Sequence, residues 1–345
     1  MDLPLSTYGA DESGLICGYL FEGEQPATAL DSRTAAAAID AIRAASPAKG
    51  APDAPRFLWL HFNLAHAGTA RWLERHADLS PAFHDALKDD LRSTRIERDE
   101  DALVAVVNDV HFDFSFEPSD IATLWASLDA RVVVTARQSP LRSIDQLRTA
   151  VKAGEPLRST VELLERLLRA QADVLVDIVR SVTRQVDQVE DALLASRLDV
   201  KRARLGALRR LLVRLQRLLA PEPASLFRLL QHPPQWMAQL DAQQLREATE
   251  EFSVALQDMA SLQERIKLLQ EEVAAIVNER NSRSLFVLTV MTVLALPINI
   301  LAGLFGMNVG GVPLAQNPHG FWLVAAIVAA FTLVAGWFAL RRPEA

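Results

Sequence analysis

The longest feature of the hydrophobic pattern is an uncharged stretch close to the C-terminus, with no Asp, Glu, Lys or Arg from residue 284 to residue 340. Two apolar runs lie inside it, at 285–305 and 321–340. About 20 helical residues cross a hydrocarbon core of about 30 Å. Each run therefore predicts a membrane-spanning helix. Residues 306–320 are rich in Gly, Pro and Asn and predict a loop between the two spans.

The basic residues beside the two spans predict their orientation. Arg280 and Arg283 precede the first span, and Arg341 and Arg342 follow the second. Positively charged flanks stay in the cytoplasm. We therefore expect both termini, including a short tail at 341–345, to be cytosolic. The N-terminus has neither the basic nor the apolar region of a signal peptide, so the large N-terminal part is also expected in the cytosol.

Residues 1–140 predict a cytosolic α/β domain, because short apolar or alternating runs are interleaved with helical patterns. The expected strands are 14–21, 56–63, 93–97, 102–112 and 131–135. The expected helices are 32–45, 67–76, 81–91 and 118–128. A loop is expected at 45–55.

Residues 141–235 predict cytosolic antiparallel helices, at 157–197 and 199–219. The second helix is basic, and its charged residues are Lys201, Arg202, Arg204, Arg209, Arg210, Arg214 and Arg217. They are interpreted as a charged helix face, with a regulatory or anionic-lipid contact as the alternative. Four prolines then predict a short turn that breaks the helices, namely Pro221, Pro223, Pro233 and Pro234.

A heptad repeat follows in residues 236–284, which predict a stalk helix. One apolar row is Leu245, Phe252, Met259, Ile266 and Val273. The other row is Ala248, Ala255, Leu262, Leu269 and Ile276. No breaker separates the stalk from the first span, so one helix of roughly 100 Å is expected. A helix of that length predicts self-association rather than burial within its own subunit.

A second row on the stalk is mostly acidic, and consists of Glu251, Asp258, Arg265, Glu272 and Glu279. Positions that flank an apolar seam commonly form salt bridges between helices. The alternative interpretation is an acidic lining that attracts cations.

Composition excludes several classes of protein. The net charge is −7, so a nucleic-acid binder that relies on overall positive charge is not expected. The single cysteine, Cys17, allows neither an internal disulfide nor a multi-thiolate zinc site. His61 and Asn63 share one face of a strand, and His61 is interpreted as structural. No motif of an enzyme is present, and neither catalysis nor a resident cofactor is expected.

The first span carries polar and small residues along one stripe, at 100° per residue. The stripe is Leu285, Leu288, Thr292, Leu296, Asn299, Gly303 and Gly306. An asparagine in hydrocarbon has no water to satisfy its amide. Asn299 therefore either forms hydrogen bonds between helices or lines an aqueous pore.

The tripeptide Gly306-Met307-Asn308 closes the first span, and Val309-Gly310-Gly311-Val312-Pro313 follows it. With this tripeptide, the C-terminal hairpin, the stalk and the α/β domain, the chain resembles the CorA superfamily of divalent-metal transporters, most closely its ZntB zinc-transporter branch. The resemblance implies a funnel-shaped homopentamer in a bacterial inner membrane.

The resemblance also implies roles for particular residues. Five copies of the stripe from Leu285 to Gly303 would line the pore. Asn308 would meet hydrated cations at the outer mouth, and Gly306 and Met307 would shape that turn. Arg341 and Arg342 would lie near the cytosolic exit.

The loop after the tripeptide has no acid, and its one titratable side chain is His319. Magnesium prefers oxygen ligands, whereas imidazole suits zinc. Zinc uptake, aided by the proton gradient as in the resembled branch, is therefore expected, with His319 as a candidate contact. The alternatives are a magnesium or broad divalent-cation channel, and a membrane-anchored oligomeric scaffold without a pore.

Overall fold

The computed structural model of the chain describes residues 9–44, 56–88, 93–115, 120–194, 202–307 and 317–340. These residues form two compact units, Met1–Leu269 and Gln270–Ala345, which divide within one long helix. The first unit contains a sheet and most of the helices. The second contains the end of the long helix and the last helix.

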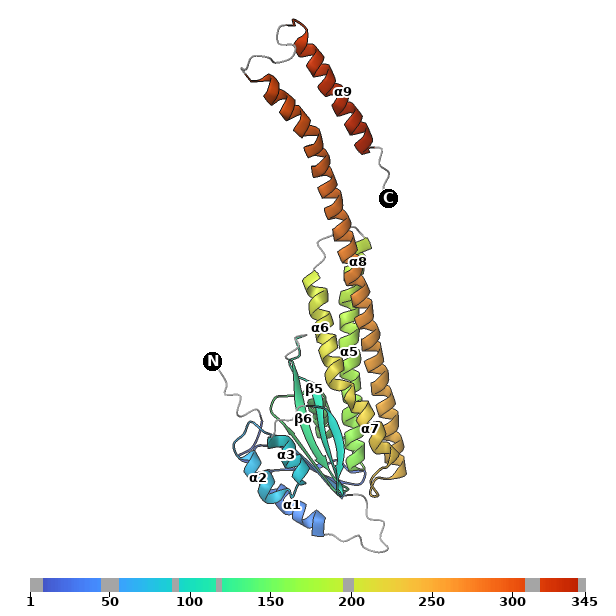
Figure 1. The fold of residues 1–345 in the computed structure, drawn as a ribbon. Coiled ribbons are helices and arrows are strands. Elements are labelled where there is room, and N and C mark those ends of the chain that lie inside the picture. The colour runs from blue at the N-terminus through green and yellow to red at the C-terminus, as the bar shows by residue number, and fades with distance from the viewer. Residues whose placement is uncertain are drawn as a thin grey trace. The chain divides into compact units, whose positions relative to one another are not determined.

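A seven-stranded sheet with the order β2-β1-β3-β7-β6-β5-β4 forms the base of the first unit (Figure 1). Only β3 and β7 pair in parallel; every other neighbouring pair is antiparallel. The strands are β1 (Leu15–Glu22), β2 (Thr28–Leu30), β3 (Arg56–Asn63), β4 (Arg95–Asp99), β5 (Ala102–Val110), β6 (Ile121–Leu128) and β7 (Val132–Arg137).

Helices cover both faces of this sheet. On one face, α1 (Ser32–Ala44) and α2 (Thr69–His76) pack on β1, β3 and β7, and α3 (Pro81–Lys88) packs on β5 and β6. The other face meets α4 (Arg142–Lys152), α5 (Thr160–Leu194), α6 (Arg202–Leu219) and α7 (Pro221–Gln231). Neighbouring residues of β3 show the division, since Leu58 belongs to the first core and Trp59 to the second.

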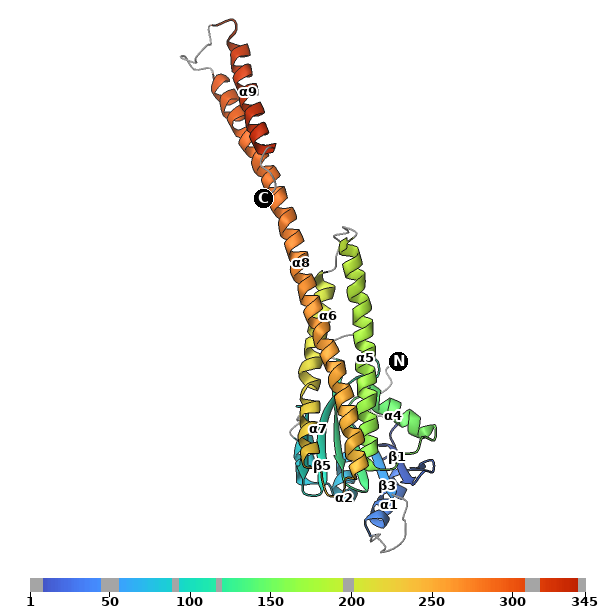
Figure 2. The same cartoon turned by 90° about the vertical axis from the view of Figure 1, so that its right-hand side faces the viewer.

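The long helix α8 (Gln239–Phe305) begins in a bundle with α5, α6 and α7 (Figure 2). Nine of the ten heptad residues predicted for its apolar seam are buried, and only Ile276 is partly exposed. Leu245, Phe252 and Met259 share one core with residues of α5, α6 and α7. The expectation that the helix is not buried within its own subunit is therefore wrong for the seam over residues 245–269, because helices of the same chain cover it.

The outward face of α6 is charged. Arg210, Arg214 and Arg217 lie exposed on α6, whose opposite face is a buried row of leucines. This agrees with the interpretation of the basic run as a charged helix face.

The helix predicted at 118–128 is wrong, because residues 121–128 form strand β6 between β5 and β7. Trp125 belongs to one core and Ala126 to the other, so both faces of the strand are buried. A strand buried on both faces loses the alternation that identifies strands in a sequence. Tertiary coverage of the sheet thus concealed the strand.

Three short elements were not predicted, namely β2, α4 and α7. The turn expected from the prolines was partly wrong, since Pro221 and Pro223 lie in the first turn of α7. Proline is tolerated there because the first-turn N–H groups have no partner within the helix.

The second unit contains the last part of α8 and α9 (Gly320–Leu340), which runs antiparallel to it (Figures 1 and 2). Both helices are long and apolar enough to cross a membrane. None of the most apolar window of α8 is buried inside the chain. Pro297 lies within α8 and has no N–H to donate to the carbonyl of Val293.

The core position of Phe252 gives the first prediction. Its side chain is fully buried, whereas Val254, two residues on, is 58% exposed. We expect Phe252→Ala to lower the free energy of unfolding by about 3–5 kcal/mol through the cavity it leaves. Val254→Ala should change it by less than about 0.5 kcal/mol. Denaturant unfolding of the detergent-solubilised protein, followed by tryptophan fluorescence, measures both; equal losses would contradict the packing described.

Glu222 gives a prediction about pH. It is buried at the start of α7, and no partner in the described part of the chain bonds to its Oε2. Burial, followed by the charge of Asp109, raises the pKa of Glu222 well above its usual range. The folded state then holds a proton that the unfolded state releases, so stability falls as the pH rises above the unfolded pKa.

Glu222→Gln removes this ionisation and keeps the shape of the side chain. We expect the variant to be more stable than the parent near pH 8, with little difference near pH 4. Thermal unfolding across this range measures the effect. Burial raises the pKa of Asp109 to about 6. Asp109 therefore makes the stability of both proteins fall with rising pH. A stability difference that does not change with pH would contradict the assignment.

Candidate functional site

The predicted stripe of the first span lies on the last part of α8. Leu285, Leu288 and Leu296 are 64%, 60% and 57% exposed, and Thr292, Asn299 and Gly303 are exposed as well. A Cβ added at Gly303 would meet nothing within 4 Å. The described residues of the chain therefore neither cover this stripe nor require its small residue.

The polar groups of the stripe differ in how they are satisfied. The hydroxyl of Thr292 donates to the carbonyl of Leu288 at 2.9 Å, and that of Thr289 donates to Leu285 at 2.8 Å. These threonines need no external partner in hydrocarbon. The side-chain amide of Asn299 forms no hydrogen bond with any described residue of the chain. Its donors and acceptor must be met by groups other than the described residues of this chain.

The residues beyond the helix end are only partly described. Gly306 follows the last residue of α8 and donates its N–H to Ala302 at 2.9 Å, and Met307 is 52% exposed. Asn308 and the pair Arg341 and Arg342 lie outside the described residues.

His319 lies directly before α9. The backbone N–H of His319 donates to Oδ1 of Asn317 at 2.9 Å. Its backbone carbonyl accepts a hydrogen bond from the N–H of Leu323. The backbone of His319 thus starts the second apolar helix, while the structure assigns its imidazole no partner among the described residues.

The acidic row of the stalk divides into residues that pair with α5 and residues that form no ion pair with any described residue. Arg169 on α5 pairs with Glu251 at 3.0 Å. Nε of Arg265 donates to Glu190 at 2.9 Å, and the same guanidinium bonds to Asp187. The hydrogen bonds that Arg265 donates to Glu190 and Asp187 raise the pKa of its guanidinium. Asp258, Glu272 and Glu279 are exposed.

A different acidic row shares the register of the stripe. Counting back in sevens from Leu285 leads to exposed residues, three of which are glutamates, and these are Asn278, Glu271, Glu264, Gln257 and Glu250. Sequence analysis missed this row because it followed the row one position further along. Counting in sevens from Asn299 would have found it.

His61 is confirmed as structural. Arg137 donates to Nε2 at 2.9 Å, which leaves Nδ1 to donate to Thr135 at 2.8 Å. Burial, followed by the neighbouring charge of Arg137, lowers the pKa of His61 well below its usual range. With both nitrogens occupied, this ring offers no ligand to a metal ion. In the described part of the chain, no group of three or more His, Cys, Asp or Glu residues could hold a metal.

Comparison with known proteins agrees with this arrangement. The model of the family "CorA-like Mg2+ transporter protein" matches residues 55–342. The chain is 28% identical over 334 residues to the divalent cation transporter CmaX of Pseudomonas aeruginosa, covering 96% of this chain and 97% of that one. It is 23% identical over 280 residues to the zinc transport protein ZntB of Yersinia enterocolitica, covering 81% and 85% of the two chains.

Two solved structures share the fold. The structure of full-length CmaX matches with a TM-score of 0.77 and 27% identity, over 96% of this chain and 98% of that chain. The complete structure of the CorA magnesium transporter of Methanocaldococcus jannaschii matches with a TM-score of 0.71 and 19% identity, over 95% and 98%. The α/β domain, the long helix and the two apolar C-terminal helices thus occur together in known proteins.

The unsatisfied amide predicts which face of α8 meets water. We expect the thiol of Asn299→Cys to react with a charged methanethiosulfonate reagent in lipid vesicles about tenfold faster than that of Leu301→Cys, since only thiolates in water react. Leu301 lies about 200° further round the helix. Cys17 supplies a low background, because burial raises the pKa of its thiol to about 12. Equal rates at the two positions would contradict a hydrated stripe.

Proposed function

The chain belongs to the family of CorA-like Mg2+ transporter proteins, and from this premise we propose that it takes up zinc across a bacterial inner membrane. The path runs between copies of the first span, and both termini are cytosolic. Arg280 and Arg283 before the first span and Arg341 and Arg342 after the second support this orientation.

The observation that carries the proposal is the amide of Asn299. It lies on the exposed, acid-free span at the end of α8 and has no hydrogen-bond partner among the described residues. A ring of such amides provides carbonyl oxygens that replace part of a cation's hydration shell. The tripeptide Gly306-Met307-Asn308 would act in the same way at the outer mouth, with Asn308 as the residue that meets the hydrated ion.

One or two hairpins cannot enclose an ion path, so the proposal includes an oligomer, and a homopentamer follows from the family resemblance. The apolar seam of α8 is occupied within the chain. Its exposed row is therefore the face available to the axis. Glu250 and Glu271 would line the approach to the pore and raise the local concentration of cations. Glu264 lies in the same row but contributes less, because Lys267 pairs with it at 2.9 Å. Glu251 contributes less, because Arg169 already pairs with it.

Zinc is preferred over magnesium on the chemistry of the loop. Residues 309–320 contain no acid, and His319 is the titratable group there. Imidazole favours zinc, while magnesium favours carboxylates and keeps its waters. The relatives named as zinc transport proteins support this choice. A broad divalent-cation transporter is the second candidate, favoured by the relative that is named for divalent cations in general.

The two spans contain no carboxylate. A proton that is coupled to zinc uptake therefore has to cross the membrane without a carboxylate carrier in the spans. Uptake of zinc that is driven by a proton gradient would then move protons with the metal or along water in the pore.

The experiment is zinc uptake into proteoliposomes, with and without a pH gradient, and with magnesium in a parallel series. We expect zinc flux to exceed magnesium flux and to rise with the gradient. Asn308→Ala and Asn299→Leu should each lower it at least about tenfold, which corresponds to about 1.4 kcal/mol in the barrier. Thr332→Val on α9 is the matched control, because its hydroxyl already donates to Val328.

Each other outcome selects an alternative. Equal fluxes of both metals would make the protein a broad divalent-cation transporter, and zinc flux that ignores the gradient would remove proton coupling. No flux from a protein that sizes as an intact oligomer would favour the scaffold without a pore. A monomer or dimer in detergent would remove the pore argument.

A further inference from the structure

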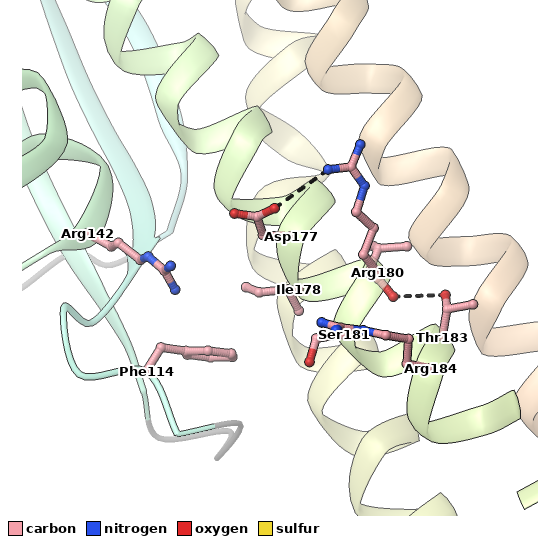
Figure 3. A pocket seen from close by; sticks show the side chains of 9 residues that line it. Phe114, Arg142, Asp177, Ile178, Arg180, Ser181, Thr183 and Arg184 are labelled. Carbon is pink, nitrogen blue, oxygen red and sulfur yellow. Dashed lines mark hydrogen bonds and ion pairs between the residues drawn. The ribbon is translucent and has the colours of Figure 1, made fainter. Parts of the chain in front are cut away.

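A groove on the first unit lies away from the apolar helices, between α5, the start of α4 and the segment that follows β5 (Figure 3). Its volume is about 780 Å³, which is within the range of sites for small organic ligands. Its lining includes Phe114, Arg142, Ile178, Ser181 and Arg184. We call it the arginine groove.

The charge of the arginine groove is positive. Three arginines line it, Arg142, Arg180 and Arg184, against one carboxylate, Asp177. Asp177 pairs with Arg180 at 3.8 Å. Within the described ranges, no carboxylate forms an ion pair with Arg142 or Arg184. Figure 3 shows both side chains extending into the space between α4 and α5.

The position of Arg142 is held by a buried contact behind it. The carboxylate of Asp109 accepts hydrogen bonds from the N–H and the hydroxyl of Ser143, each at 2.9 Å. Asp109 is buried, so this contact fixes the first turn of α4 to the sheet. The guanidinium of Arg142 takes no part in this contact between Asp109 and Ser143.

The remaining lining combines a polar donor with an apolar wall. The hydroxyl of Ser181 forms no hydrogen bond with another described residue, whereas that of Thr183 donates to Val179 at 2.9 Å. Phe114 and Ile178 provide apolar surface beside the arginines. A bare inorganic ion would make no apolar contact with this lining.

We propose that the arginine groove binds a phosphate-bearing organic anion of nucleotide size. Arg142 and Arg184 bind its phosphates, Ser181 donates to a phosphate oxygen, and Phe114 contacts its apolar part. Guanidinium groups match phosphate oxygens through paired hydrogen bonds, which explains two arginines on neighbouring elements. The same charges repel divalent cations, so the groove is separate from the path of the transported metal.

The test is calorimetric titration of the full-length protein in detergent with ATP, in a chelating buffer of low salt. Adenosine and inorganic pyrophosphate are titrated in parallel. We expect ATP to bind with a Kd below about 1 mM, pyrophosphate to bind more weakly, and adenosine not to bind. Raising the salt should weaken the binding of ATP, because the contacts are charged.

The variant Arg142→Gln/Arg184→Gln should weaken ATP at least about tenfold. Arg214→Gln is the matched control, since this arginine is exposed on α6 and lies outside the groove; it should change the Kd by less than about twofold. Thermal unfolding verifies that both variants fold. Absence of ATP binding, or equal binding by the double variant, would overturn the proposal. Pyrophosphate that binds as tightly as ATP would overturn the role of Phe114. No metal flux is measured, so the result is independent of transport.

Discussion

The burial of the α8 seam against α5, α6 and α7 is the contact on which the rest of the molecule depends. Phe252, Met259 and Ile266 are fully buried in the core that also contains the inner faces of those three helices. The apolar face of α8 is therefore buried by helices of the same chain. The opposite row stays exposed; it carries glutamates on the stalk and shares the heptad register of Asn299 in the span.

Ion pairs between α5 and α8 distinguish the acids beside the buried seam from those on the exposed face of α8. Arg169 and Arg265 lie where α5 and α8 meet. Arg169 on α5 pairs with Glu165 of its own helix and with Glu251 of α8. Arg265 on α8 pairs with Asp187 and Glu190 of α5. Pairs of this kind contribute little to stability when they are exposed to water. These pairs neutralise the acids beside the seam, whereas the outward Glu250 and Glu271 form no ion pair with any described residue of the chain.

Three polar groups in apolar surroundings differ in how their hydrogen-bonding atoms are satisfied. His61 is buried, but both of its ring nitrogens are bonded, to Arg137 and Thr135. Thr292 is in an apolar span, but its hydroxyl returns to the backbone of its own helix. Asn299 has no partner of either kind among the described residues. An unpaired amide in hydrocarbon is costly, and that cost is reasonable only where a neighbour, water or an ion meets it.

The sequence by itself determined the apolar hairpin, the long helix and the stripe through Asn299. These follow from hydrophobicity, length and helical period, which are properties of a single segment. Tertiary structure alone decided three other matters. Residues 121–128 form a strand because a sheet covered on both faces hides its alternation. The heptad seam closes within the chain, since an apolar row does not identify the surface that covers it. The arginine groove exists because the fold brings Phe114, Arg142 and Arg184 together from separate segments.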